Sequence, residues 1–407
     1  YKLELVHVII RHGDRTPMHR IGNSPNPPVP CKFDQQLIDQ DEIVKHYLKH
    51  LTQNSKHHHP GSDFAFWETY PNDATCDSSK LTPTGAYQHL INGRNLYYKY
   101  AVKWKLFGSN VSNIDYQIRS TEVSRTFQSA LAFMYGFLQN FNFSNLLVKK
   151  SPINFCSEKL SGHKCNCPGK MKYLQKSEKY AANLNVNRGP QKDIRKHLGE
   201  IYNLPPSQVP YLTQVMDVLM GQACHKIPLK CGRKNGKCVD KSTVDIIWSL
   251  IEEEGIKGRM KNKDYLKYAH LTFHPLLTEI MLRMSNVTKQ KPTPKFVIYS
   301  GHDVTLTPLL ATLGIYDGKW PPYASRLNIE MYGGMENGKS HHFIRVVYNG
   351  VDVTKKLNFC KTFVDGMCRF KHFQLFVKNH LKILGFKSYN SACHGIQSSK
   401  FNKKLVL

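Results

Sequence analysis

The sequence predicts an α/β fold with a mixed central sheet flanked by helices and an inserted, mainly helical cap. Two apolar runs, residues 3–10 and 295–300, are typical of strands buried on both faces, and polar residues follow each run directly. Segments with helical periodicity lie between and after them. Residues 149–263 differ from the rest because they are rich in cysteine and charge and are broken by proline. These observations indicate a helical insertion in an α/β core.

The elements follow in chain order. After the first strand, residues 22–30 and 53–72 have the composition of loops. Thr82 is the expected N-cap of a helix through residue 100, since Pro83 suits the first helical position. A strand from residue 116 leads into a helix through residue 138. A helix over 264–284, strands at 295–300, 327–331 and 343–348, and a turn at Asn349-Gly350 complete the pattern.

We therefore expect an α/β core made of residues 1–148 and 264–394, a cap of residues 149–263 and a tail of residues 395–407. A chain of 407 residues with 41% hydrophobic content is long enough for one large α/β domain with an inserted lobe, or for two domains. This composition excludes a disordered chain.

The first strand ends in the sequence Arg-His-Gly-Asp-Arg-Thr-Pro, residues 11–17. Phosphoryl transfer needs a nucleophile, cations around the phosphate oxygens and a proton donor. The flanking charges of Arg11 and Arg15 disfavour a protonated His12, so a ring nitrogen stays free for attack, and both guanidiniums suit phosphate. Gly13 is expected to let the backbone turn close to a ligand. The motif follows a strand, where α/β sheets bind ligands, and therefore predicts a covalent phosphate-handling site.

Two further segments supply polar residues after strands. Residues 295–300 lead directly into His302 and Asp303, a pair suited to binding a phosphoryl group and protonating a leaving alkoxide. Arg125 is expected at or near the first turn of a helix, where helix amides also favour phosphate. By itself, an ordinary surface role for Arg125 is an equal alternative.

Together these motifs resemble the histidine acid phosphatases, the branch of the histidine phosphatase superfamily with Arg-His-Gly-x-Arg-x-Pro early and His-Asp late. The resemblance covers nearly the whole chain, up to about His394. It implies a phosphohistidine mechanism in which His12 attacks phosphorus, Asp303 protonates the departing oxygen and water hydrolyses the intermediate. It also implies a phosphate pocket and a structural or supporting role for Arg119; the pocket residues are Arg11, Arg15, Arg125 and His302.

Within the family, the likeness is closer to the branch that acts on 2-phosphoxylose than to the lysosomal or prostatic enzymes. The features that carry it lie around Cys156, Cys165–Pro168, residues 235–240, residues 348–354 and residues 392–394. This likeness implies a substrate, the 2-O-phosphate of xylose in the glycosaminoglycan–protein linkage region during proteoglycan synthesis. A broad-specificity acid phosphatase of the secretory pathway and an inactive glycosaminoglycan-binding protein on the same fold are the alternatives.

Substrate selection is expected from the cap and the loop after Pro17, because a phosphate pocket treats all monoesters alike. Aromatic and basic residues in these regions are candidates for sugar stacking or carboxylate pairing, with simple loop packing as the alternative. They are Phe66, Trp67, Tyr70, Lys170 and Tyr173.

The chain carries 57 Lys and Arg against 30 Asp and Glu, a formal charge of +27. Such a field favours a polyanionic partner, here glycosaminoglycan or a heparin-like chain. Nucleic acid is not expected, since no finger, homeodomain or RNA-binding aromatic motif accompanies the charge. Because the basic residues are dispersed, compositional bias is an equal alternative.

Eleven cysteines and three glycosylation sequons, at Asn110, Asn142 and Asn286, indicate the secretory pathway. Disulfides are expected, with at least one cysteine left over. A zinc site is the competing interpretation, but its spacings lack the short paired cysteines that structural zinc favours, so we expect no metal and no other cofactor. The zinc candidates are Cys156, Cys165, Cys167, Cys224, Cys231 and Cys238, with His163 and His225.

No apolar run reaches the roughly 18 residues that a membrane span needs. The family resemblance implies a single N-terminal signal-anchor, outside this sequence, and a catalytic domain in the Golgi lumen. The run of histidines 57–59 is expected in a solvated loop and not in a ligand set.

Overall fold

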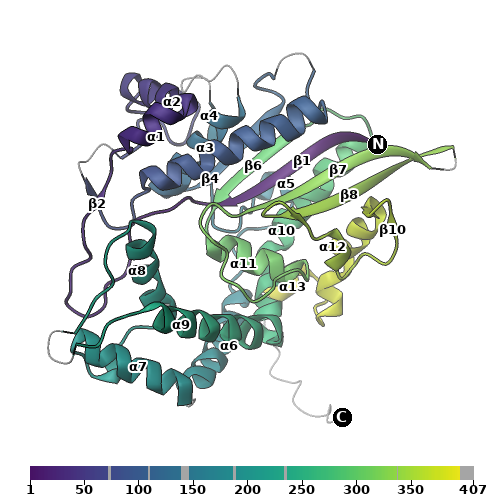
Figure 1. Ribbon diagram of the computed structural model, residues 1–407. Coiled ribbons are helices and arrows are strands. Elements are labelled where there is room, and N and C mark those ends of the chain that lie inside the picture. The colour runs from purple at the N-terminus through teal and green to yellow at the C-terminus, as the bar shows by residue number, and fades with distance from the viewer. Residues whose placement is uncertain are drawn as a thin grey trace, which may run out of the picture.

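A mixed β-sheet forms the central layer of the molecule (Figure 1). The computed structural model describes residues 1–71, 75–108, 111–138, 146–186, 189–232, 236–336 and 338–394. Across these residues the strand order is β10-β11-β8-β7-β1-β6-β4-β5, and β9 pairs with β8. The strands are β1 (Lys2–Arg11), β4 (Tyr116–Thr121), β5 (Val148–Ser151), β6 (Phe296–Gly301), β7 (Arg326–Glu336), β8 (Lys339–Tyr348), β9 (Val351–Asp352), β10 (Phe363–Val364) and β11 (Met367–Arg369). A separate small pair joins β2 (Val29–Pro30) to β3 (Thr75–Cys76).

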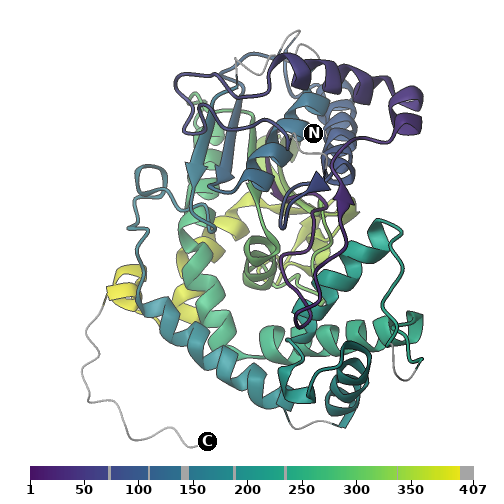
Figure 2. The same cartoon turned by 90° about the vertical axis from the view of Figure 1, so that its left-hand side faces the viewer.

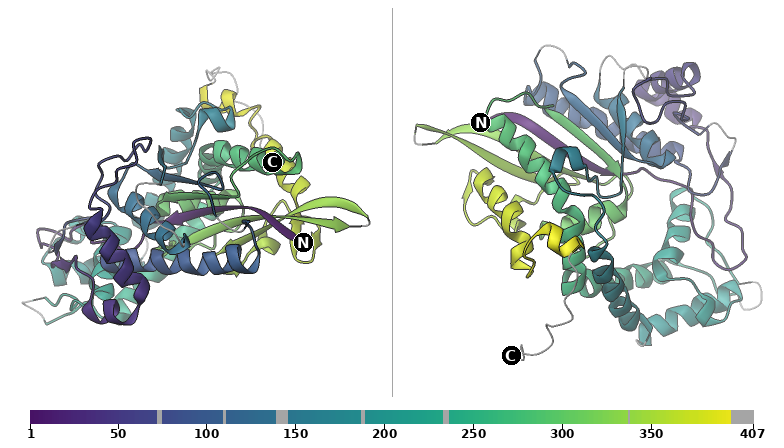
Figure 3. Two further views of the ribbon diagram at one scale, coloured as in Figure 1. Left: turned by 90° about the horizontal axis from the view of Figure 1, so that it is seen from above. Right: turned by 180° about the vertical axis from the view of Figure 1, so that it is seen from behind.

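Helices cover both faces of the sheet, as the view from above shows (Figure 3). The helices of the core are α1 (Gln35–Gln40), α2 (Glu42–Gln53), α3 (Pro83–Tyr97), α4 (Ser124–Phe137), α5 (Glu158–Ser161), α10 (Lys263–Thr288), α11 (Asp303–Thr312), α12 (Phe370–Ile383) and α13 (Tyr389–His394), with a 3₁₀ turn η5 (Thr354–Lys356). The helices between α5 and α10 are α6 (Gly169–Val186), α7 (Gly189–Tyr202), α8 (Leu212–Cys224) and α9 (Lys241–Glu254), with a 3₁₀ turn η3 (Pro206–Gln208) and a π-helix η4 (Gly255–Met260).

Strand β1 lies at the centre of the sheet and is buried on both faces, as its apolar run predicts. Alternate side chains enter different cores. Val6 and Val8 belong to the core under α3 and α4, whereas Leu5 and Ile9 belong to the core under α10 and α11. The predicted strand is therefore confirmed, and its burial fixes where its last residues emerge.

Helix α3 begins as expected and ends differently. Thr82 is its N-cap, because the Thr82 hydroxyl accepts a hydrogen bond from the backbone N–H of Gly85, and Pro83 follows. The α-helix ends at Tyr97 and continues as a π-helix, η1 (Tyr98–Lys103). The extra residue per turn changes the side-chain directions, so that Lys99 and the buried Tyr100 both reach Glu330 on β7.

Helices α6 to α9 form a lobe on one side of the sheet (Figure 2), and α7, α8 and α9 share a hydrophobic core there. Leu198 of α7, Val215 of α8 and Ile247 of α9 are buried together there. The helices predicted for this segment are thus present, and α8 brings the lobe back to the carboxyl ends of the strands.

Five disulfides join ten of the eleven cysteines: Cys31–Cys76, Cys156–Cys165, Cys167–Cys393, Cys231–Cys238 and Cys360–Cys368. The expectation of disulfides is confirmed, and Cys224 is the leftover thiol. The zinc interpretation is wrong for these cysteines, because all of its candidate thiols except Cys224 are engaged in disulfides.

The histidine run 57–59 lies in a loop but is not all solvated. His57 is fully buried, with its ring 5.5 Å from that of Phe127, while His58 is exposed. Packing against the aromatic cluster around Phe127 explains the difference.

No helix in the described part of the chain is long and apolar enough to cross a membrane.

Candidate active site

The carboxyl ends of three neighbouring parallel strands bring the three predicted segments together. Strand β1 pairs with β6 through Arg11 and Gly301, and β6 pairs with β4 through Ser300 and Ser120. His12, His302 and the loop before α4 therefore leave the sheet at the same edge. The rings of His12 and His302 lie 5.5 Å apart, centroid to centroid.

His12 presents a free nucleophilic nitrogen. Its Nδ1 lies 2.8 Å from the carbonyl oxygen of Gly13, and because a carbonyl only accepts, Nδ1 must carry the proton. Nε2 then has a free lone pair. Burial, followed by the charges of Arg11 and Arg125, holds the pKa of His12 well below its usual range. This direction agrees with the expected neutral histidine, and burial lowers the pKa of His12 more than the flanking arginines do.

The three predicted arginines lie around His12. Arg11 and Arg15 are buried, and the guanidinium of Arg11 stacks on Tyr323 with 4.2 Å from Cζ to the ring centroid. Arg125 is the second residue of α4, in the first turn as predicted, and burial lowers its pKa to about 10, so it remains charged. All three charges lower the pKa of His12, which places their positive field on the same side chain.

His302 and Asp303 begin helix α11. His302 Nε2 lies 2.8 Å from the hydroxyl oxygen of Thr121 at the end of β4, and burial lowers the pKa of His302 to about 3. Burial alone would raise the pKa of Asp303, but Arg11 and a hydrogen bond from the Trp320 indole outweigh it, so the pKa is lowered. Asp303 is therefore a carboxylate in the free protein.

Asp217, on cap helix α8, holds the motif loop. Its carboxylate pairs with the Arg15 guanidinium at 2.7 Å, and both side chains are almost fully buried. It also accepts the backbone N–H groups of Met18 (2.8 Å) and His19 (3.2 Å). Through these contacts the cap fixes the direction of Arg15, one of the arginines expected to bind phosphate. The motif reasoning missed Asp217, although a lone carboxylate in the apolar run 215–219 was an available signal.

Gly13 is required by close packing against another backbone. A Cβ on Gly13 would lie 2.2 Å from the carbonyl oxygen of Gly85, in the first turn of α3. The structure thus shows a second reason for this glycine, and its close approach to a ligand stays a prediction. The neighbouring Asp14 is also held by contacts within the protein. Its buried carboxylate accepts hydrogen bonds from Thr82 and from His225 (2.8 Å).

A cavity of about 650 Å³ lies between the residues at the strand ends and the cap helices. His12, Arg15, Arg125, His302 and Asp303 line its core side, and Trp320 borders it too. Its cap side is formed by α6, α8, α9 and η4; the polar and charged residues there are Ser177, Glu178, Thr213, Gln214, Asp217, Glu254 and Arg259.

The five residues proposed for sugar recognition do not line this cavity. Trp67 packs on Phe64 and Phe127, and the Tyr70 hydroxyl donates to the Cys31 carbonyl, so both belong to the loop's own packing. Tyr173 packs on Phe386. Phe66 and Lys170 are likewise absent from the lining. Phe66 is exposed and Lys170 lies on α6, so the alternative of loop packing describes Trp67 and Tyr70 only.

The remaining sequence candidates lie away from the cavity. Arg119 is buried and does not line the cavity; it is paired with Glu279 of α10 at 2.7 Å, in agreement with the structural role expected for it. Asn286 lies in the last turn of α10. Asn110, Asn142 and the tail 395–407 lie outside the described residues.

Comparisons with known proteins agree with this geometry. The model of the histidine phosphatase superfamily (branch 2) matches residues 2–221 and 252–349, and the chain belongs to this family. It is therefore a phosphatase by class.

The chain is also similar to individual proteins of known name or structure. The chain is 32% identical to human 2-phosphoxylose phosphatase 1 over 97% of its own length and 82% of that protein, and 32% identical to the Xenopus tropicalis protein of the same name over 97% and 77%. Among solved structures, the phytase of Citrobacter braakii shares the fold with a TM-score of 0.57 at 15% identity, over 93% of this chain and 98% of that one.

Proposed function

We propose that this protein removes the 2-O-phosphate from xylose in the glycosaminoglycan–protein linkage region, through a phosphohistidine intermediate. Membership of the histidine phosphatase superfamily supports the reaction class. The xylose 2-phosphate substrate is supported by the relatives named 2-phosphoxylose phosphatase 1, whose likeness extends over 97% of the chain.

In the first step, Nε2 of His12 attacks phosphorus and the bond from phosphorus to the sugar oxygen breaks. Asp303 gives its proton to that oxygen, which leaves as the sugar hydroxyl. The charges of Arg11, Arg15 and Arg125 stabilise the three non-bridging oxygens as they move, and His302 completes this pocket.

In the second step, water attacks the phosphohistidine. Asp303, now a carboxylate, takes a proton from the water, and the bond between phosphorus and Nε2 breaks. Phosphate leaves, His12 is again neutral and Asp303 again carries the proton. The cycle needs a protonated Asp303 at its start, although the pKa of Asp303 is lowered in the free protein. A bound phosphate offsets the charge of Arg11, so substrate binding and mildly acidic pH both favour the protonated form.

One observation carries the mechanism more than any other. The Gly13 carbonyl accepts a hydrogen bond from Nδ1–H of His12. Nε2 therefore has the free lone pair and is the nitrogen available for attack. The same cavity lining contains Asp303 and two of the arginines, Arg15 and Arg125. A nucleophile, a proton donor and cations in one cavity are what phosphomonoester hydrolysis requires.

The cap side of the cavity is expected to select the sugar, because the phosphate pocket addresses only the phosphoryl group. We place the reaction in the Golgi lumen, with an N-terminal anchor as the family resemblance implies. Five disulfides fit an oxidising compartment of the secretory pathway.

The test is phosphate release from a 2-O-phosphoxylose linkage oligosaccharide and from a small aryl phosphate, measured in parallel. We expect kcat/KM to be much higher for the oligosaccharide. His12→Ala should abolish both activities, while His58→Ala, a change at an exposed histidine, should leave both unaltered.

Each other outcome has a defined meaning. Equal use of both substrates would replace the proposal by a broad acid phosphatase. No release from either would favour a glycosaminoglycan-binding protein without activity. Near-normal turnover by His12→Ala would refute the phosphohistidine mechanism.

A further inference from the structure

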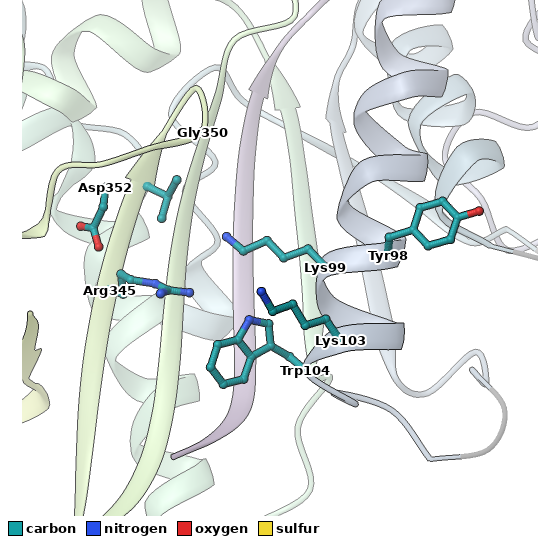
Figure 4. Close-up of a pocket in the computed structure, with 8 residues that line it drawn as sticks. Tyr98, Lys99, Lys103, Trp104, Arg345, Gly350 and Asp352 are labelled. Carbon is teal, nitrogen blue, oxygen red and sulfur yellow. The ribbon is translucent and has the colours of Figure 1, made fainter. Parts of the chain in front are cut away.

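A second cavity of about 500 Å³ lies between η1 and the β7–β8 hairpin (Figure 4). We call it the Lys103 pocket, and its lining residues are Tyr98, Lys99, Lys103, Trp104, Arg345, Val347, Gly350 and Asp352. None of them lines the active-site cavity. Its volume is in the range of ligand sites in proteins.

The pocket is well separated from His12. Arg345 on β8 pairs with Glu330 on β7, and Glu330 pairs with Val6 on β1. Val6 precedes Arg11 by five residues along the strand, a distance of roughly 17 Å. A change at the solvent side of this pocket therefore leaves the catalytic groups untouched.

Three cationic side chains converge on the pocket. Figure 4 shows the amino groups of Lys99 and Lys103 pointing into the space between η1 and β8, with the Arg345 guanidinium facing them. Within the described residues the Lys103 ammonium has no ion-pair partner, and this side chain is exposed. It is thus the cation most available to a ligand.

The other two cations are fixed from below by one buried carboxylate. Glu330 has no exposed surface, and its oxygens bind Lys99 at 2.6 Å and Arg345 at 2.7 Å. The hydroxyls of Tyr100 and Tyr332 donate to the same carboxylate at 2.6 and 2.8 Å. Both cations are therefore held in place, which lowers the entropy cost of binding an anion.

Hydrogen-bond donors remain for that anion. Lys99 uses one of its N–H groups on Glu330, and Arg345 uses Nε on Glu330 and Nη2 on the Tyr332 hydroxyl. An ammonium has three N–H groups and a guanidinium has five, so both keep donors after these bonds. Such an array binds oxyanions, among them carboxylate, sulfate and phosphate groups.

The remaining lining favours a sugar over a bare anion. Trp104 and Val347 supply apolar surface, against which the C–H face of a sugar ring can pack. Asp352 is exposed and lines the pocket, and one of its oxygens already accepts the backbone N–H of Thr354 at 2.9 Å. The second oxygen is suited to accept a hydroxyl, a group that sugars have in number and that a DNA backbone lacks.

We propose that the Lys103 pocket is a second binding site for an acidic saccharide, a chain that carries uronate carboxylates or sulfates. It rests on the proposed function in one respect, because a linkage-region substrate continues into such a chain. The pocket would hold the glycan at a distance from the phosphate that His12 attacks.

The test measures binding of two size-matched probes, a heparin octasaccharide and a hyaluronan octasaccharide, to the full chain. Heparin carries sulfates and carboxylates, while hyaluronan carries carboxylates alone, so the pair identifies the anionic group that is bound. We expect Lys103→Glu to weaken binding of at least one probe by about fivefold or more. Lys378→Glu, an equal charge change at an exposed residue of α12, should change it by less than about twofold.

A second variant separates sugar recognition from charge. Asp352→Asn keeps an oxygen for the Thr354 N–H and removes the hydroxyl acceptor, while the net charge becomes more positive. Sugar recognition predicts weaker binding of the octasaccharide, whereas a purely electrostatic surface predicts tighter binding. Tighter binding, or equal losses for Lys103→Glu and Lys378→Glu, would overturn the proposal.

Two further readings complete the design. A single-stranded DNA oligonucleotide of equal charge should bind Asp352→Asn as tightly as the native protein or more tightly, because only charge attracts it; the same loss as for the saccharide would overturn the assignment to a sugar. Turnover of the aryl phosphate should stay within about twofold in every variant, since none touches the catalytic groups. If 2-phosphoxylose is hydrolysed and Lys103→Glu binds normally, the pocket alone fails. If Lys103→Glu loses binding and 2-phosphoxylose is not hydrolysed, only the proposed function fails.

Discussion

The indole N–H of Trp320 donates a hydrogen bond to Oδ2 of Asp303, the residue proposed to protonate the leaving group. The same indole lies over Arg11, 5.5 Å from Cζ to the ring centroid. One side chain therefore supports both the proposed proton donor and a cation of the proposed phosphate pocket. Because a hydrogen bond to a carboxylate favours its ionised form, Trp320 also helps to set the pKa of Asp303.

Trp320→Phe keeps an aromatic ring near Arg11 and removes the N–H. The pKa of Asp303 should rise, since one of the groups that lower it is lost. Activity needs the protonated acid, so the alkaline limb of the kcat/KM profile should move to higher pH, while looser positioning lowers kcat by roughly tenfold. A profile with an unmoved alkaline limb would show that the indole acts by packing alone.

Asp303→Asn should slow turnover according to the leaving group. For an alkyl phosphate, whose alkoxide needs a proton, we expect a loss of about 10²- to 10⁴-fold in kcat/KM, which reports the first step and not the hydrolysis of the phosphohistidine that both substrates share. An activated aryl phosphate leaves readily without protonation and should lose far less. Asp317→Asn, at an exposed aspartate, is the matched control. Equal losses on both substrates would argue against a proton-donor role.

Asp217→Asn tests the contact between the cap and the motif. The variant leaves the buried Arg15 charge without its partner at 2.7 Å, which should cost about 3 kcal/mol of unfolding free energy and raise KM through a misplaced guanidinium. Urea unfolding and substrate titration measure the two effects. Asp245→Asn breaks an exposed pair with Lys241 and should cost less than about 1 kcal/mol. Similar costs for both variants would contradict this reading of the cap.

A buried histidine cluster should make stability depend on pH. His380 Nδ1 lies 2.6 Å from His270 Nδ1, and His380 Nε2 lies 2.8 Å from His274 Nδ1, so α12 is fastened to α10 through the three rings. Burial lowers the pKa of His270 to about 4, of His274 to about 3 and of His380 to about 2.

These shifts give the sign of the pH effect. Unfolded histidine binds a proton near pH 6.5, whereas the folded rings stay neutral, so the unfolded chain takes up more protons as the pH falls. Stability should be complete above about pH 6.5 and decline towards pH 4, by up to about 2 kcal/mol for each ring at pH 5. Urea unfolding at pH 7 and pH 5 measures it. His380→Gln should reduce this dependence and His58→Gln should not; equal slopes would refute the assignment.

Much of the fold follows from local sequence. Three features are examples: the alternation of β1 side chains between two cores, the N-cap Thr82 and the helix over 263–288. Each depends on residues close together in the chain, because strand and helix periodicities span only a few residues. The C-terminal end of α3 is harder to predict from the sequence. Its change to a π-helix depends on Glu330, more than two hundred residues away, which binds both Lys99 and Tyr100.

The sequence by itself determined the chemistry of the site. His12 with its flanking arginines, and the His302-Asp303 pair, lie directly after apolar strands, and the rule that ligands bind beyond strand ends placed them together. Only the tertiary structure decided which residues support them. Asp217 comes from the cap and Trp320 from the segment after α11, and which cysteines pair was equally open. The reason is physical: such contacts join side chains far apart in the chain, so they depend on sheet register and on how the cap packs, which no local pattern encodes.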